Sequence, residues 1–236
     1  MKKISYGGAR VIACAVLTSI IFALAAFSVT GERTVSLLGV DENTPVYHGD
    51  RSKARVAIMI NVYENAEVVD KMIDLLKENN AKATFFVGGC WADDNAETVR
   101  KIVESGMEIA NHGYFHKDCK VLSEDACEKE IVSNHTLVKA LCGVDMELFA
   151  PPSGSFDDKT LKVCGRLGYK TIMWSKDTID WRDGDVDTIF RRATDKFENG
   201  DMILMHPKKH SLEALGKILS FYKEKGVETV TVSEII

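Results

Sequence analysis

Short apolar runs alternate with segments of helical periodicity along most of this chain. Residues 56–60 form a continuous apolar run of strand length, and residues 83–87 form another. Between these runs, residues 67–79 place apolar side chains every three or four positions, which is the spacing of one helix face. The order strand, helix, strand is typical of a unit in which a helix joins two parallel strands.

The alternation continues to the end of the chain and predicts seven or so such units. Continuously apolar strands indicate a parallel sheet that is buried on both faces. We therefore expect an α/β fold whose sheet is covered by helices and closed, or nearly closed, into a barrel. The expected strands are residues 56–60, 83–87, 107–110, 148–149, 171–174, 202–205 and 229–232. The expected helices are residues 67–79, 93–105, 123–141, 158–167, 186–197 and 211–225.

Residues 1–30 have a different pattern. Lys2, Lys3 and Arg10 precede an uncharged apolar run over residues 11–27. Positive charge before such a run directs the chain that follows across a membrane. We expect residues 1–30 to be an uncleaved signal anchor or transmembrane helix, because the apolar run approaches the length that spans a bilayer.

The rest of the chain divides into a linker and one domain. Residues 31–51 are polar and mixed, and they predict a juxtamembrane linker. Residues 52–236 hold all the alternating elements and form a single domain. Small residues at positions 23–25 leave open a cleaved signal peptide. In either case we expect the domain outside the cytoplasm, at the cell membrane or secreted.

Composition narrows the classes of function. The chain has 236 residues, of which 45% are hydrophobic and 28% charged, and its formal net charge is -5. Lysine and arginine are scattered among acidic residues, so we expect no nucleic-acid partner. We also expect the protein to be a monomer. The 6 cysteines are irregularly spaced. We expect those of the domain to be mostly buried free thiols, and a single disulfide is left open.

Candidate chemistry follows the ends of the predicted strands. Asn61, His112, residues 150–154, residues 177–181 and His206 each come directly after an expected strand. In parallel α/β folds the carboxyl ends of the strands share one edge, where functional residues gather. The sequence therefore predicts one site that is built from these five segments.

The pair His112 and His116 is the most specific chemical signal. The two imidazoles are four residues apart, directly after the apolar run 107–110. Neutral imidazoles that converge on one point are the usual ligands of a divalent metal. We therefore expect a metal site.

Five motifs in residues 52–236 resemble, in the same order, those of the polysaccharide deacetylase family, which has the nodulation-type (NodB homology) domain and is also called carbohydrate esterase family 4. The similar segments are residues 82–88, residues 111–116 (the family's HxxxH), residues 151–154 (RxPYG), residues 174–181 (WxxDxxDW) and residues 204–206 (LxH). The resemblance implies a distorted (β/α)₇ barrel, similar to a TIM barrel.

The resemblance also implies a reaction, the removal of acetyl groups from an N-acetylated polysaccharide of the cell wall or spore wall. The family holds a divalent metal with one aspartate and two histidines, and the metal polarises the acetamide carbonyl. His112 and His116 match the two histidines, with zinc as the expected metal and cobalt or manganese as alternatives. His206 matches the general acid that protonates the leaving amine.

Other residues match supporting roles in the family. Asp180 matches the carboxylate that orients the acid, with Asp177 as second choice, and Trp181 matches a wall of the acetyl pocket. The backbone N–H of Ser153, next to Pro152, matches a donor to the developing oxyanion.

The first family motif is degenerate in this chain. Where the family has TFDDG, residues 59–63 read Met-Ile-Asn-Val-Tyr. Asn61 therefore stands at the position of the catalytic base, and Val62 stands at that of the metal-binding aspartate. Ala150 replaces the arginine that pairs with the base carboxylate. The loss of the base carboxylate and the loss of the arginine fit each other, because a buried arginine without its carboxylate would be an uncompensated charge.

Three hypotheses follow. Glu64 or Glu67 substitutes as metal ligand or base, and a deacetylase remains. Alternatively, the imidazoles with Asn61 and water hold metal weakly, and turnover is slow or absent. In the third hypothesis the protein is an inactive, membrane-anchored glycan-binding pseudoenzyme. The degenerate motif resembles that of a sporulation-associated branch of the family. We expect a metal-dependent hydrolase, with working or residual activity, and the pseudoenzyme is the alternative.

Overall fold

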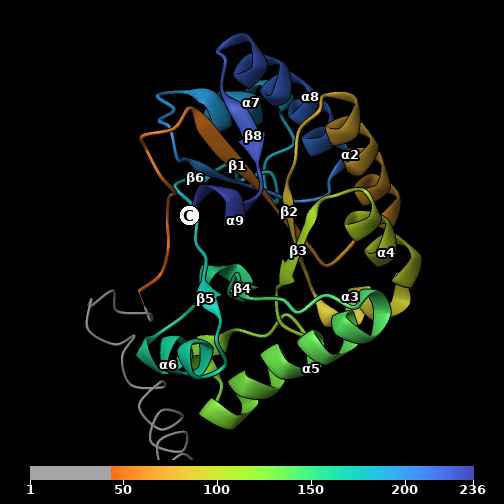
Figure 1. Cartoon of the computed structure of the whole chain (residues 1–236), viewed down its shortest axis with the longest axis vertical. Coiled ribbons are helices and arrows are strands. Elements are labelled where there is room, and N and C mark those ends of the chain that lie inside the picture. Colours follow the sequence, from red (N-terminus) through yellow and green to blue (C-terminus); the bar gives the residue numbers. More distant parts are fainter. Residues whose placement is uncertain (1–43) are drawn as a thin grey trace, which may run out of the picture. The chain divides into compact units, whose positions relative to one another are not determined.

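The computed structural model describes residues 44–236, which form a curled parallel sheet with all but the last helix packed on its outer face (Figure 1). Every strand pairing is parallel, as the continuously apolar runs predicted. The strands are β1 (Arg55–Val62), β2 (Thr84–Val87), β3 (Glu108–Asn111), β4 (Leu148–Phe149), β5 (Lys170–Thr171), β6 (Lys176–Asp177), β7 (Met202–Met205) and β8 (Glu228–Val230).

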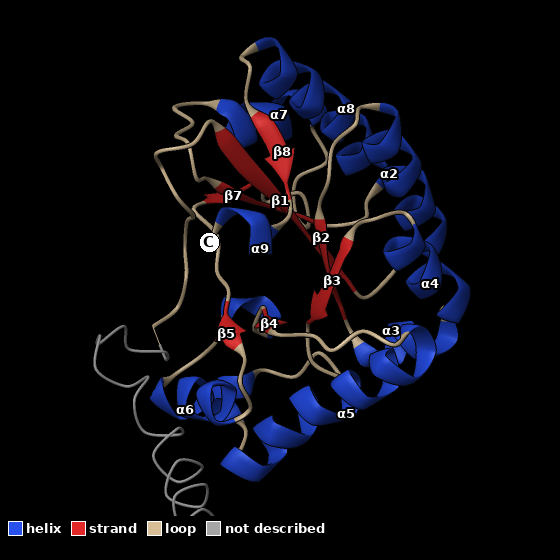
Figure 2. Ribbon diagram, viewed as in Figure 1, coloured by secondary structure: helices blue, strands red, loops and turns tan. Residues whose placement is uncertain are grey.

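The helices follow the strands in chain order and surround the sheet (Figure 2). Short 3₁₀ turns at Cys119–Val121 and Pro152–Gly154 lie in the loops after β3 and β4. The helices are α2 (Ala66–Glu78), α3 (Gly89–Asp94), α4 (Ala96–Glu104), α5 (Glu124–Cys142), α6 (Asp158–Arg166), α7 (Val186–Thr194), α8 (Lys209–Glu224) and α9 (Val232–Ile235).

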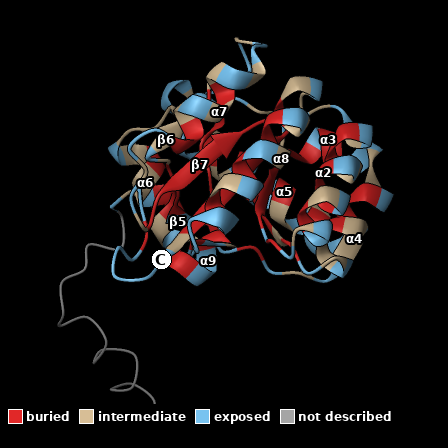
Figure 3. Cartoon of the chain, turned by 90° about the horizontal axis from the view of Figure 1, so that it is seen from above, coloured by how far each residue is buried: buried red, intermediate tan, exposed pale blue. Residues whose placement is uncertain are grey.

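The central strand β1 shows why both faces of the sheet are apolar. Its residues point alternately to opposite faces. Ile60 and Val62 belong to the core between the sheet and the helices, whereas Ala57 and Met59 belong to a smaller core inside the curl. Buried residues accordingly concentrate on the strands and on the helix faces turned toward them (Figure 3).

The sheet is a curled half-barrel, so the expectation of a closed or nearly closed barrel is corrected. The strand order is β5-β4-β3-β2-β1-β7-β6, with β8 added beside the amino-terminal half of β1. The two edge strands, β5 and β6, do not pair with each other. The physical reason is length, since β4, β5 and β6 are two residues long and offer few backbone groups for pairing.

Residues 46–49 span the open side of the half-barrel. The N–H of Val46 donates to the Thr171 carbonyl over 2.9 Å, and the Val46 carbonyl accepts from Met173. The N–H of Gly49 donates to the Gly200 carbonyl, just before β7, over 2.8 Å. The segment was expected to belong to the linker 31–51, but it is hydrogen-bonded to the domain. It is the orange segment of Figure 1.

Three of the differences from the expected elements change the kind or number of elements. The helix expected over residues 93–105 is two helices, α3 and α4, which meet at Asn95. The strand expected over residues 171–174 ends at Thr171, and β6 was not expected. The strand expected to reach residue 232 gives way to α9, because Thr231 and Glu234 form a reciprocal capping box that begins a helix.

No helix within residues 44–236 is long and apolar enough to cross a membrane. The anchor expected at residues 1–30 lies outside the described residues, as does most of the linker.

Candidate functional site

The site residues expected from the sequence lie at the carboxyl ends of their strands. Asn61 is the penultimate residue of β1, His112 follows β3, and Ala150 follows β4. Asp177 ends β6, and His206 follows β7. Because all these strands are parallel, the structure places the five positions along one edge of the sheet.

His112 is buried and oriented for a role as a metal ligand. Its Nδ1 lies 2.7 Å from the Ala150 carbonyl oxygen, so Nδ1–H donates and the lone pair of Nε2 stays free. Burial, and after it the nearby His116, lower the pKa of His112 to about 3. The imidazole is therefore neutral, as metal ligation requires.

His116 lies beside His112, with a ring-centroid separation of 4.9 Å. Its backbone is left-handed, with φ 56°. Such strain in a non-glycine residue is typical of functional sites. Burial lowers the pKa of His116, which also favours the neutral form.

His206 forms a tight pair with the buried Asp180. The Nδ1 of His206 lies 2.7 Å from one Asp180 oxygen, and the backbone N–H of His206 donates to the other oxygen over 2.8 Å. The Ser211 hydroxyl also donates to Asp180, over 2.5 Å. Burial alone would raise the pKa of Asp180, but the His206 and Ser211 contacts outweigh burial and lower it. The carboxylate thus fixes the imidazole and leaves Nε2 free.

The degenerate β1 end offers no carboxylate to the imidazoles. Asn61 is 3% exposed, and its Oδ1 has no hydrogen-bond partner within residues 44–236. Val62 is fully buried among the apolar side chains that face the helices. Ala150 is buried in the core inside the curl and contributes only its backbone carbonyl to His112.

The two candidate substitute ligands are engaged elsewhere. Glu64 forms an ion pair with Lys208, in the loop after His206. Glu67 is largely exposed and bonds to Lys71, one turn further along α2, over 2.6 Å. In residues 44–236 no three His, Cys, Asp or Glu side chains could together hold a metal ion. The hypothesis that Glu64 or Glu67 completes the metal site is therefore not supported by this arrangement.

The residues with expected substrate roles occupy the surrounding loops. Pro152 and Ser153 form a 3₁₀ turn in which Ser153 has a left-handed backbone with φ 56°. Trp181 is 53% exposed, beside the guanidinium group of Arg182. Asp177 accepts a hydrogen bond from the backbone N–H of Ile179 over 2.8 Å, so its carboxylate shapes its own turn.

Three residues of the site were missed from the sequence. The Tyr63 ring lies 4.5 Å from the His116 ring and 6.1 Å from the His206 ring. Glu130 of α5 is buried and accepts a hydrogen bond from the Phe115 N–H, which holds the loop between the two histidines. Ser211 completes the Asp180 cluster. Only Tyr63 had a sequence signal, because it replaces the glycine of the family's first motif.

The donor set does not fit a catalytic zinc ion. Catalytic zinc sites in proteins usually have three protein ligands and one open position. Here two neutral imidazoles and an orphaned amide oxygen are available, and Val62 carries no donor atom. The edge of the sheet retains the acid–carboxylate pair His206–Asp180 without the metal ligand or the base carboxylate.

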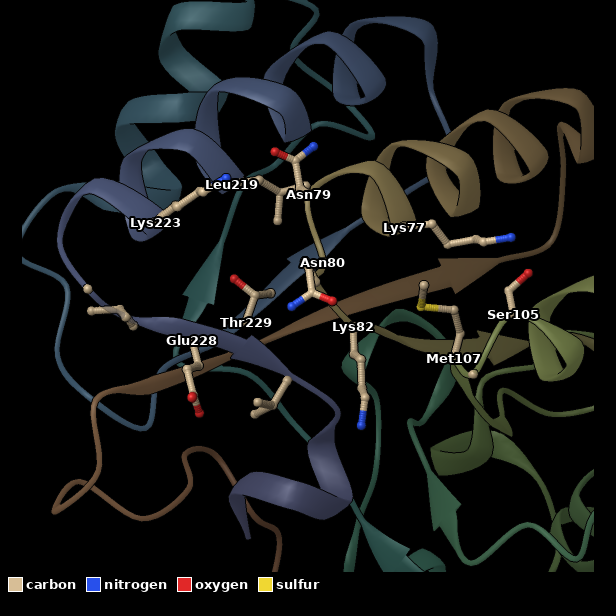
Figure 4. Close-up of a pocket in the computed structure, with 15 residues that line it drawn as sticks. Lys77, Asn79, Asn80, Lys82, Ser105, Met107, Leu219, Lys223, Glu228 and Thr229 are labelled. Carbon is tan, nitrogen blue, oxygen red and sulfur yellow. The ribbon is translucent and has the colours of Figure 1, made fainter.

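A separate cleft of about 840 Å³ opens at the amino-terminal ends of β2, β3 and β8 (Figure 4). It is lined by Lys77, Lys82 and Lys223 together with Glu228, whose carboxylate accepts from Arg55 over 2.8 Å. None of the expected site residues lines this cleft. The candidate site therefore remains at the opposite ends of the strands.

Comparison with known proteins finds the sequence pattern of the polysaccharide deacetylase family over residues 48–172. The uncharacterised protein YlxY of Bacillus subtilis is 35% identical over 192 residues, which are 81% of this chain and 60% of YlxY. A peptidoglycan-N-acetylglucosamine deacetylase of Bacillus cereus is 32% identical over 197 residues, which are 81% of this chain and 72% of that protein. The chain thus spans less than two thirds of YlxY.

Among solved structures, a carbohydrate esterase 4 family pseudoenzyme of Bacillus anthracis, BA3943, superposes with a TM-score of 0.79 at 34% identity. The superposition covers 82% of this chain and 69% of that one. A mutant of the same pseudoenzyme is described as having restored enzymatic activity.

Proposed function

The chain belongs to the polysaccharide deacetylase family, and we propose that it is a non-hydrolytic member that binds N-acetylated glycan of the cell wall. The proposal departs from the expected hydrolase and adopts the alternative, the glycan-binding pseudoenzyme.

One observation carries the proposal: the Val62 side chain is fully buried in the helix-facing core at the position where the family has its metal-binding aspartate. A hydrocarbon side chain supplies no ligand, and its packing in the core between the sheet and the helices is part of the fold. The amide of Asn61 cannot act as a general base either, since it takes up no proton near neutral pH. In the family one carboxylate binds the metal and another acts as the general base. This chain has neither carboxylate at those two positions.

The exposed aromatic residues at this edge of the sheet are suited to binding a glycan. Phe115 is 58% exposed and Trp181 is 53% exposed, both in the loops that carry site residues. Aromatic faces are good surfaces for the apolar face of a sugar ring, because they bury area at low cost in side-chain entropy. The relatives named as peptidoglycan deacetylases support a wall glycan as the ligand.

The location is part of the proposal. Residues 1–30 anchor the protein in the cell membrane, and the domain lies on the outer side, where wall glycan is accessible. The positive charges before the apolar run of residues 11–27 support this orientation. Assignment to the sporulation-associated branch remains a prediction from the degenerate first motif.

A residual deacetylase is the second candidate, and the His206–Asp180 pair favours it. The pair keeps a 2.7 Å contact and a free Nε2, as a general acid requires. This candidate requires a third metal ligand from water or substrate.

The binding proposal is tested by sedimentation of the full-length chain, in non-ionic detergent, with insoluble N-acetylated peptidoglycan. We expect co-sedimentation that a chelator leaves unchanged. We expect Trp181→Ala to weaken it by about tenfold, as loss of one aromatic contact of about 1.4 kcal/mol would do. Tyr47→Ala, which removes an exposed aromatic ring from the 46–49 segment, is the matched control and should bind as the unmodified chain does. Absence of co-sedimentation would overturn the proposal.

A further inference from the structure

A network of hydrogen bonds connects the loop after β3 with the outer face of α5. Asn111, the last residue of β3, uses its Oδ1 to accept from the backbone N–H of Gly113 over 2.9 Å. Its Nδ2 donates to the Tyr169 hydroxyl over 3.1 Å, and that hydroxyl lies 2.6 Å from Nδ1 of His135 on α5. Tyr169 lies between α6 and β5, and α6 packs against α5 (Figure 1). We call these contacts the Asn111–Tyr169–His135 network.

Asn111 holds His112 from two sides. Its backbone carbonyl accepts from the Ala150 N–H over 3.0 Å, and the Ala150 carbonyl in turn accepts from Nδ1 of His112. Its side chain reaches across to Gly113, where the backbone turns with φ 75°. A change in the orientation of the Asn111 amide would therefore reach both His112 and the turn that leads to the exposed Phe115.

One backbone donor determines the direction of the hydrogen bonds in the network. Because the Gly113 N–H can only donate, the Asn111 atom that faces it is the oxygen, and the amide nitrogen faces Tyr169. The Tyr169 oxygen therefore accepts from Asn111, and the phenolic proton is left for Nδ1 of His135. Nδ1 must then carry no proton, and Nε2–H donates to Asp145 over 3.2 Å. The network is complete only when His135 is neutral.

Protonation of His135 would place two donors against each other across the 2.6 Å contact. The Nδ1–H and the phenolic O–H cannot both point along it, so the hydroxyl has to turn away and loses its acceptor. Tyr169 is only 5% exposed, so water does not readily replace that acceptor. The hydroxyl oxygen would then be shared by Asn111 and a charged donor, and hydrogen bonds from charged donors are the stronger ones. The bond from Asn111 to Tyr169 is therefore the one that weakens.

The groups around His135 leave its charge free to respond to pH. Asp145 favours the protonated imidazole, whereas the Lys139 ammonium group, 2.6 Å from the same Asp145 oxygen, opposes it. On the other side lie Tyr169 and the nearby Cys164 thiol, and burial raises the pKa of each to about 12. Histidine is the side chain that changes its charge between about pH 5 and pH 8. Of these groups, only His135 is expected to do so.

We propose that Tyr169 and neutral His135 are positioning residues for the loop of His112 and Phe115, and that protonation of His135 weakens glycan binding at the site. The first part concerns the loop alone. The second part rests on the proposed glycan-binding function and adds its regulation, since the site should bind wall glycan more tightly near pH 8 than near pH 5.

Hydrogen exchange without glycan tests the positioning role by itself. The full-length chain is measured at about pH 5 and about pH 8 by mass spectrometry on a peptide that includes the Gly113 amide. After correction for the intrinsic effect of pH on exchange, we expect this peptide to be less protected at the lower pH. His135→Gln can still accept the phenolic proton but takes up no proton, so it should be equally protected at both pH values. Tyr169→Phe should show the lower protection at both.

Sedimentation with N-acetylated peptidoglycan at the same two pH values tests the regulation. We expect the dissociation constant of the unmodified chain to rise at least about fivefold from pH 8 to pH 5, the lower end of the usual range for coupled sites. His135→Gln should lose most of this rise. His48→Gln is the matched control, because His48 is an exposed histidine outside the network, and it should keep the rise.

The two measurements fail separately. The same pH dependence of protection in the unmodified chain and in His135→Gln would overturn the positioning role. An equal rise of the dissociation constant in these two proteins would overturn the regulation. If no glycan sediments at either pH while protection still follows the charge of His135, the proposed function is wrong and the positioning role stands. Thermal melting checks that Tyr169→Phe is folded, and the His135→Gln comparison does not depend on that variant.

Discussion

At the scale of single residues, the buried polar groups of the site differ in how fully they are paired. Both carboxylate oxygens of Asp180 accept hydrogen bonds, from His206 and Ser211. The Oδ1 of Asn61 has no hydrogen-bond partner in the described part of the chain. A buried polar atom without a partner costs about 1–3 kcal/mol, so its presence is typical of a functional position. We interpret Asn61 as the remnant of the base position and Asp180 as the part of the family's machinery that is still assembled.

Asp180→Asn should destabilise the domain by about 1–3 kcal/mol at neutral pH, because the amide cannot accept from all three donors. The folded pKa of Asp180 is lowered, so its stabilisation is present above the unfolded value near 3.8 and is lost as the pH falls through the folded value. Urea unfolding of both proteins checks this. The difference in the free energy of unfolding between the unmodified protein and Asp180→Asn should have its largest value between about pH 5 and 7. It should become smaller below about pH 4. A pH-independent difference would contradict the assignment.

Residue by residue, the sequence predicted the histidines of the site because their spacing and their place after strands have a chemical meaning. His112, His116 and His206 lie where the motifs indicated. Tyr63 and Glu130 could not be predicted as site residues, because their roles depend on which loops the curl brings together. A tyrosine at a glycine position signals a change but not the direction in which its ring points.

At the scale of elements, local side-chain contacts determine where helices begin. Asp157 accepts from the Thr160 backbone N–H over 2.9 Å, and the Thr160 hydroxyl completes a reciprocal capping box at the start of α6. The sequence analysis did not predict the box of Thr231 and Glu234, because the apolar run that ends there is typical of a strand.

Asp157→Ala should lower the free energy of unfolding by about 1 kcal/mol, since it leaves backbone donors of α6 without a partner. Asp158→Ala is the matched control, because Asp158 is exposed, lies one position further along and caps nothing. We expect the control to stay within about 0.5 kcal/mol of the unmodified protein. Chemical denaturation followed by circular dichroism measures both, and equal losses would refute the role of the cap.

Elements of four or more residues with continuous apolar character were predicted at nearly their observed positions, as for β2, β3 and β7. Short elements were not. The polar residues Lys176 and Asp177 form β6 because β7 provides a partner for their backbone. Pairing of this kind depends on tertiary contacts, which leave no periodicity in the sequence.

At the scale of the whole molecule, the half-barrel is spanned by a segment that the sequence placed outside the domain. Gly49 of that segment lies against the end of the chain. A Cβ atom at this position would lie 2.3 Å from the backbone carbonyl oxygen of Ile235. The close approach of residues 46–49 to the end of the chain therefore requires glycine.

Gly49→Ala should destabilise the domain by more than about 1 kcal/mol, because the backbone must move to relieve the contact. Gly216→Ala is the contrasting variant. Gly216 lies inside α8, and its nearest neighbour to a new Cβ is 3.8 Å away. Alanine there should stabilise the helix by about 0.5–1 kcal/mol. Thermal melting should move in opposite directions for the two variants, and a neutral Gly49→Ala would show that the segment is not packed as described.

The most direct test of the central claim is acetate release from N-acetylated peptidoglycan by the full-length chain, with zinc or cobalt supplied and an active peptidoglycan deacetylase assayed in parallel. We expect no acetate above the background of the His112→Ala variant. Acetate release that is abolished by a chelator and by His112→Ala would contradict it. That outcome would show that the two imidazoles, despite Val62, still support metal-dependent hydrolysis.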